Sequence, residues 1–121
     1  MMPTAATTIG AASGVLAGFM PITSDGEALA PGLYETLRAR QADAGIADLW
    51  WYGISVEMVL ANGEHWAVEC IGPDAFRLYP GVTRDNGVTW LNVWVRRDYT
   101  LAELAGNLDD VLAAAKRKTS Q

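Results

Sequence analysis

The sequence predicts a two-layer α+β domain, in which an antiparallel sheet of about four strands packs with an N-terminal and a C-terminal helix. Apolar residues recur with the helical period towards the two ends of the chain and alternate with other residues in its middle. Asn62-Gly63 and Asn86-Gly87 interrupt the alternating segments, as is typical of β-hairpins. The length of 121 residues fits a single domain over residues 1–121.

The uncharged N-terminal stretch is expected to lie at the periphery. Residues 5–22 contain no charged side chain, but glycines and Pro21 interrupt them, and they have no basic n-region. These features disfavour a cleaved signal peptide and a membrane-spanning helix. We expect a flexible arm over residues 1–14 and a globular unit over residues 15–121, which starts with a strand or short helix at Val15–Ile22. A first segment that is packed into the fold is the alternative.

The first helix is predicted to begin after Pro31. Leu33, Leu37 and Ala44 then fall near one helical face, and Gly45 can end the helix in the left-handed conformation. The last helix is predicted from a capping box, in which Thr100 is the N-cap and Glu103 reaches back. An apolar stripe follows this cap, formed by Leu101, Leu104, Ala105, Leu108, Val111, Leu112 and Ala115.

The segment from Trp50 to Leu60 is predicted to be one strand, because its residues alternate with a period of two. A three-residue loop, Ala61–Gly63, with Gly63 in the left-handed conformation, leads into the next strand. This register is favoured over a two-residue loop because it gathers the apolar residues of both strands on one side. These residues are Ile54, Val56 and Met58 on the first strand, and Trp66, Val68 and Cys70 on the second.

The polar residues of this hairpin are expected to share the opposite face. Glu57 is diagonal to both His65 and Glu69, within reach of long side chains. Two carboxylates and an imidazole can act as acid, base or metal ligands. However, the chain has a single histidine, and such residues are common on sheet faces that contact water. We therefore predict no catalytic, cofactor-binding or metal-binding residue, and a solvated surface or a protein-binding face is expected.

Trp50 and Trp51 are neighbours, so in a regular strand they point to opposite faces. Trp51 is a candidate exposed binding residue beside the row of Glu57 and Glu69, although core packing under the N-terminal segment is the favoured alternative. Large aromatic side chains are frequent anchors in protein interfaces. The candidate partner-binding site therefore comprises Trp51, Glu57, His65 and Glu69.

Two further strands are predicted after this hairpin. The first spans Phe76–Thr83 and is bent at Pro80, and the second spans Val88–Arg97, after the turn at Asn86-Gly87. Apolar residues lie on both sides of the last strand, which indicates that both of its faces are covered.

Two acidic side chains and the only thiol lie outside this hairpin face, and none of the three is assigned to the candidate site. Asp109 and Asp110 fall on the polar side of the last helix and are expected to be solvated. Cys70 is the only cysteine, so it cannot form an internal disulfide and is expected to be a small buried residue in a reducing compartment.

The charge of the chain narrows the classes of partner. The net charge is −5, yet three of the nine basic residues lie at positions 116–118, so the rest of the chain carries six arginines against fourteen acids, or 6 − 14 = −8. Such a surface repels nucleic acid and anionic membranes, and it favours a protein with a basic surface.

A small acidic α+β domain without catalytic residues resembles bacterial inhibitor and immunity proteins in class and charge, although no motif is shared with them. We therefore expect a cytoplasmic, non-enzymatic domain that masks a basic surface of another protein. One alternative is a chaperone or a subunit of a larger phage or secretion assembly, in which a homo-oligomer is also possible. The other alternative is a small ligand-binding domain or enzyme with a tryptophan-lined pocket.

Overall fold

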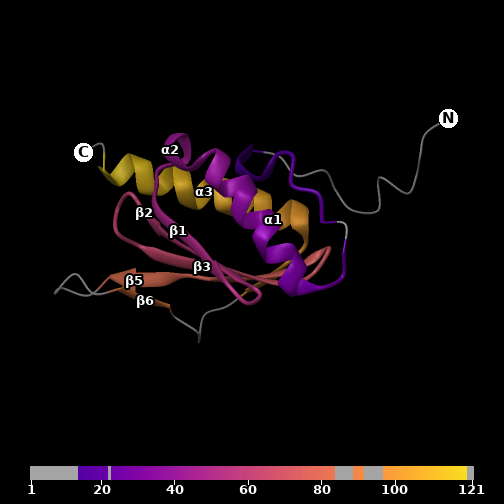
Figure 1. The fold of residues 1–121 in the computed structure, drawn as a ribbon. Coiled ribbons are helices and arrows are strands. Elements are labelled where there is room, and N and C mark those ends of the chain that lie inside the picture. The colour runs from indigo at the N-terminus through magenta and orange to yellow at the C-terminus, as the bar shows by residue number, and fades with distance from the viewer. Residues whose placement is uncertain (1–13, 22, 84–88, 92–96, 120–121) are drawn as a thin grey trace.

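The computed structural model describes residues 14–21, 23–83, 89–91 and 97–119, and it confirms the predicted α+β class (Figure 1). A five-stranded antiparallel sheet forms one layer, and the helices cover one of its faces. The helical elements are η2 (Gly14–Leu16), α1 (Gly26–Ala39), α2 (Gln41–Ala44) and α3 (Leu101–Thr119). The strands are β1 (Ile46–Tyr52), β2 (Ser55–Leu60), β3 (His65–Gly72), β4 (Ala75–Tyr79), β5 (Gly81–Thr83), β6 (Thr89–Leu91) and β7 (Arg97–Tyr99).

The five-stranded sheet has the simple order β1-β2-β3-β4-β7, while β5 and β6 pair in a separate two-stranded sheet. Helices α1 and α3 place their apolar faces on the larger sheet. All buried side chains among the described residues are apolar, and all of them except Ala67 form one continuous core. The sheet therefore has one face in the core and one face turned away from the helices.

The predicted strand over Trp50–Leu60 is wrong, because the chain reverses within it. Strands β1 and β2 form a hairpin, with Tyr52 paired to Ser55 across a two-residue turn. The first turn residue, Gly53, has φ 60°, and no residue other than glycine has a positive φ in the described chain. This pattern is the type II′ turn, which requires glycine at its first central position and matches the twist of the two strands.

The predicted hairpin between β2 and β3 is confirmed. The Leu60 N–H donates to the Glu64 carbonyl at 2.8 Å, and the Gly63 N–H donates to the Leu60 carbonyl at 2.9 Å. Gly63 has φ 88°, the left-handed conformation that this loop requires. The predicted pairs follow from it, including Met58 with Trp66 and Val56 with Val68. The buried face of the hairpin thus collects its apolar residues.

The break predicted at Pro80 is confirmed, but the single strand predicted over Val88–Arg97 is wrong for its described residues. Strand β6 pairs with β5, whereas β7 pairs with β4 in the larger sheet. Proline lacks an N–H group and cannot continue the hydrogen-bond ladder of a sheet. Strands β4 and β5 are therefore separate at Pro80, and each pairs with a different strand, β4 with β7 and β5 with β6. The turn at Asn86-Gly87, together with residues 84–88 and 92–96, lies outside the described residues.

The first helix begins earlier than predicted, at Gly26 and not after Pro31. The Asp25 side chain is the N-cap and accepts the Glu27 N–H at 3.0 Å. Aspartate is a preferred N-cap residue, so Asp25 provides a local start signal for this helix. Pro31 lies inside the helix. As predicted, a left-handed Gly45, with φ 78°, ends the helical region.

At the predicted boundary between the N-terminal arm and the globular unit, η2 begins with Gly14 and packs on α3. Val15 and Leu16 are buried in the core. The Asp109 carboxylate of α3 accepts the Val15 N–H at 2.9 Å, across 94 residues of sequence. Asp109 therefore joins α3 to η2, a contact that we call the Asp109 tether, and the expectation that Asp109 is only solvated is corrected. Residues 1–13 lie outside the described residues.

The predicted capping box of α3 is confirmed. Thr100 Oγ1 accepts the Glu103 N–H at 3.2 Å, and Glu103 Oε1 accepts the Thr100 N–H at 2.9 Å. A carboxylate from the β3–β4 turn adds a further cap, because Asp74 Oδ1 accepts the Leu101 N–H at 2.8 Å. The predicted apolar stripe lies in the core, with Val111 half-buried beside it.

Helix α3 allows a comparison of a cap with a core contact. Replacement of Thr100 by Ala should lower the free energy of unfolding by about 1 kcal/mol, through the lost cap. The Leu108 side chain is fully buried, so Leu108→Ala should cost more, about 2–5 kcal/mol, because it leaves a cavity. Urea denaturation of the two variants measures both losses. Equal and negligible losses would contradict the packing of α3.

The Asp109 tether can be tested against its neighbour Asp110, which is exposed. Asp109→Ala should destabilise the fold by about 1–3 kcal/mol relative to Asp110→Ala, because it leaves the Val15 N–H without its charged acceptor. The two substitutions change the charge and the helix propensity of α3 in the same way. A denaturation series therefore isolates the tether, and identical midpoints for the two variants would show that the contact contributes nothing.

Candidate partner-binding face

The face of the five-stranded sheet turned away from α1 and α3 carries the candidate site, and we call it the open face. Directly paired residues share a face, so the strand register assigns each side chain to one side. A first row across the sheet joins Tyr52, Ser55, Glu69, Arg77 and Asp98. A second row joins Trp50, Glu57, Ala67 and Tyr79. The hairpin register predicted from the sequence thus generates most of this face.

Glu57 and His65 meet on the open face, as the sequence predicted. Their side chains form a hydrogen-bonded pair, with Glu57 Oε1 2.8 Å from His65 Nε2. The pair is well shielded from water, since the side-chain exposure is 22% for Glu57 and 14% for His65. The Trp50 ring lies against the imidazole, with 5.5 Å between ring centroids. This arrangement fixes both polar side chains on the sheet surface.

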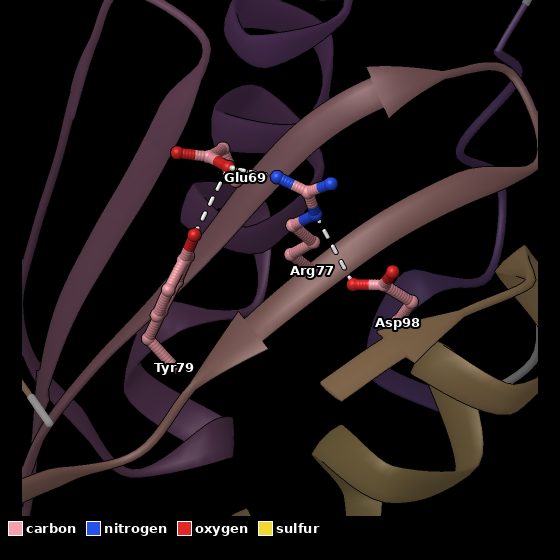
Figure 2. Close-up of polar contacts among 4 residues, drawn as sticks. All are labelled: Glu69, Arg77, Tyr79 and Asp98. Carbon is pink, nitrogen blue, oxygen red and sulfur yellow. Dashed lines mark hydrogen bonds and ion pairs between the residues drawn. The ribbon is translucent and has the colours of Figure 1, made fainter. Parts of the chain in front are cut away.

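Glu69 belongs to a different polar chain on the same face (Figure 2). Its Oε1 atom accepts a hydrogen bond from the Tyr79 hydroxyl at 3.1 Å and lies 3.7 Å from an Arg77 guanidinium nitrogen. The Arg77 Nε–H donates in turn to Asp98 Oδ1 at 3.1 Å. No hydrogen bond or ion pair of the described residues joins Glu69 to Glu57 or His65. The predicted trio therefore divides into two separate polar clusters.

The prediction that Trp51 lies beside Glu57 and Glu69 is wrong. Trp51 pairs with Val56, whose side chain is fully buried, so it points to the helix side of the sheet. The reason is the turn at Gly53, which reverses the chain and exchanges the two faces of β1 relative to a continuous strand. Trp50 takes the predicted place, opposite Glu57.

Two exposed apolar residues of the open face were not predicted. Tyr52 is 80% exposed at the end of β1, and Ile71 is 41% exposed towards the end of β3. The strand predicted over Trp50–Leu60 places Tyr52 on the same side as Ile54, which is wrong, and Ile71 follows Cys70, the last residue of the predicted pairing. Tyr52 could have been found from Gly53, because a Gly-X pair between alternating residues is a hairpin signal.

The described residues of the open face carry more negative than positive charge. Glu57, Glu69 and Asp98 supply three carboxylates, and Arg77 neutralises part of their charge. A cleft of about 290 Å³ adjoins this face between the sheet and the start of α3, with Ile71 and Phe76 in its lining. Two further carboxylates, from Asp74 and Glu103, line the same cleft. Exposed apolar side chains therefore lie next to an acidic rim.

The chemistry available to these residues is limited. The described residues contain no group of three or more histidine, cysteine or acidic side chains that could hold a metal ion. Cys70 lies on the buried side of β3. Burial raises the pKa of its thiol to about 12, and the nearby Glu69 charge adds to the shift. A thiol with such a pKa is a poor nucleophile near neutral pH.

The cavity that comes nearest to the expected tryptophan-lined pocket is small. Trp66 contributes to a cavity of about 130 Å³ between the sheet and α3, together with Leu78, Tyr99 and Val111. Small-molecule sites usually measure about 300–1,000 Å³. The side chains of Trp90 and Trp94 lie outside what the structure describes.

Comparisons with known proteins add no relative: no family model, no curated protein and no solved structure matches this chain. A search of the described helices for one long and apolar enough to cross a membrane also finds none.

The burial of Cys70 predicts slow labelling of the native thiol. Native protein should react with iodoacetamide at pH 8 far more slowly than protein unfolded in urea, because only the unfolded thiol is exposed and ionises near its ordinary pKa of 9.0. The same shift predicts a loss of stability between pH 9 and 12, because the unfolded state releases its proton first as the pH rises. Rapid labelling of native protein would contradict the buried position.

Proposed function

We propose that this domain binds another protein through the open face, as an inhibitor or immunity-type protein that masks a basic surface. The observation that carries the proposal is the exposure of two apolar side chains. Tyr52 is 80% exposed in the same row of the sheet as Glu69 and Asp98, and Ile71 is 41% exposed in the cleft that Asp98 also lines. A patch of exposed apolar side chains rimmed by charge is typical of an interaction site. The charge of −8 over the rest of the chain favours a basic partner.

The polar contacts of the open face support this role, because they orient the carboxylates before a partner arrives. Tyr79 and Arg77 both contact Glu69, and His65 contacts Glu57. A carboxylate that is already oriented loses little side-chain entropy when it pairs with an incoming lysine or arginine, and this lowers the cost of binding. The proposed binding face therefore comprises Tyr52, Glu57, Glu69, Ile71 and Asp98.

The cleft beside this face offers a place for one basic side chain of the partner. Its lining combines apolar atoms of Ile71 with the carboxylates of Asp74, Asp98 and Glu103, which outnumber the one lining cation, Arg77. The stem of a lysine or arginine is apolar and its head is cationic, so it would contact both kinds of surface. The proposal describes a non-enzymatic domain, in which binding and not chemistry is the function.

The test begins with capture of the partner on the tagged protein, followed by measurement of both rate constants. Glu57→Gln and Glu69→Gln together should slow association about 3- to 10-fold at low salt, because they weaken electrostatic steering. The dependence of the association rate on salt should also become shallower. Replacement of Ile71 by Ala should instead raise the dissociation rate, about tenfold for a true anchor.

The matched control is Glu35→Gln combined with Asp110→Asn. These two substitutions change the net charge by the same amount, but they lie on exposed positions of α1 and α3, on the helix side of the sheet. They should slow association less than the pair on the open face. Equal effects of the two pairs would refute a binding site on the open face, and unchanged dissociation in Ile71→Ala would remove Ile71 from it.

A further inference from the structure

Strand β1 forms one edge of the five-stranded sheet. An edge strand presents backbone N–H and C=O groups that can pair with another extended chain. Strand β1 is seven residues long and contains Trp50, Trp51 and Tyr52 in sequence, with Asp48 as its one charged residue. It therefore combines available backbone groups with large apolar side chains.

The ladder between β2 and β3 determines which groups of β1 point outwards. The Leu60 N–H bonds to Glu64 and the Cys70 N–H bonds to Ile54, so the even-numbered residues of β2 face β3. Because bonding directions alternate along an antiparallel strand, the odd-numbered residues of β2 face β1. They pair with Trp50 and Tyr52, whose backbone groups therefore point inwards. The backbone groups of Leu49 and Trp51 point to the free edge.

One of these outward groups is already occupied. The Asp48 side chain accepts the Leu49 N–H at 2.9 Å. A charged residue that covers an edge amide is a known way to limit pairing along an edge. Among the described residues, no hydrogen bond is recorded for the outward N–H or C=O of Trp51. The edge is therefore protected at Leu49 and open at Trp51.

The side chains next to this open position are incompletely packed. Trp51 is 44% exposed on the helix side, and Tyr52 is 80% exposed on the open face. The residues from Leu49 to Ser55 carry no charge. An approaching strand would therefore meet aromatic surface on both of its sides and no charged group between them.

We propose that two copies of this chain pair antiparallel through β1, with a two-fold axis at Trp51. Two directly opposed residues of an antiparallel pair exchange two N–H to C=O hydrogen bonds. The Trp51 N–H of each copy therefore donates to the Trp51 carbonyl of the other. Trp50 then lies opposite Tyr52 of the second copy, and the reciprocal contact forms on the other side of the axis. Cross-strand aromatic pairs of this kind stabilise a sheet.

Several features favour a second copy over a foreign strand as the occupant. The residues of β1 from Leu49 to Tyr52 are uncharged and include Trp51, so self-pairing around Trp51 opposes no like charges. Tyr52 ends β1 and the chain turns at Gly53, so Asp48 lies outside the paired residues Trp50–Tyr52. The two Asp48 carboxylates are separated by about 20 Å along the strands. This distance exceeds the screening length of about 8 Å at physiological salt. The proposal does not depend on the proposed function of the open face.

Sedimentation of the purified full chain, from about 10 μM to about 1 mM and without any partner protein, tests the dimer. Amide hydrogen exchange over the same range locates its interface. The Trp50 amide should be protected at every concentration because it faces β2. The Trp51 amide should gain protection only as dimer forms. A chain that stays monomeric throughout, or a dimer in which the Trp51 amide exchanges freely, would overturn the proposal.

Three variants sharpen this test. Tyr52→Glu should weaken the dimer at least about tenfold, because it removes an aromatic contact and adds a negative charge beside the axis. The matched control, Ile71→Glu, makes the same charge change at an exposed site on the central strand β3 and should leave the dimer intact. Asp48→Ala removes a negative charge from each copy close to the paired residues and should tighten the dimer. Equal weakening by Tyr52→Glu and Ile71→Glu would reject the β1 interface.

Discussion

The register of the hairpin between β2 and β3 is the constraint on which the rest of the structure depends. The loop at Ala61–Gly63 places Val56, Met58 and Val68 in the core. A shift of one residue would exchange the two faces of the hairpin. It would then bury Glu57 and His65, at a cost of several kcal/mol for unpaired polar groups. The same register aligns β1 through β2 and β4 through β3, so it decides which side chains form the open face.

Features determined by neighbouring residues could be predicted from the sequence, and features determined by distant residues could not. The capping box at Thr100 and the left-handed Gly63 follow from local backbone requirements, so the sequence contains their full signal. The tether between Val15 and Asp109 joins residues 94 positions apart. In the sequence, Asp109 and Asp110 look alike, and only the packing of η2 on α3 distinguishes them.

The candidate site shows the same division. The pairing of Glu57 with His65 follows from the hairpin register and was predicted, whereas the contacts of Glu69 with Tyr79 and Arg77 require the neighbouring strand β4. The error at Trp51 has a local cause, because the alternation of residues 50–60 continues through the turn at Gly53 and masks it. Periodicity alone cannot distinguish a long strand from a tight hairpin when the apolar residues keep their spacing.

The negative charge of the chain has opposite effects on binding at the open face and on pairing at the β1 edge, although both belong to the same sheet. The net charge of −5 attracts a basic protein but repels a second copy at long range. Self-pairing therefore depends on short-range contacts of the uncharged β1 residues from Leu49 to Tyr52, where backbone bonds and aromatic side chains act without like charges. Added salt screens both long-range effects. Added salt should weaken the binding of a basic partner and strengthen the pairing of two copies. The two surfaces can therefore be distinguished, because their affinities change in opposite directions as the ionic strength rises.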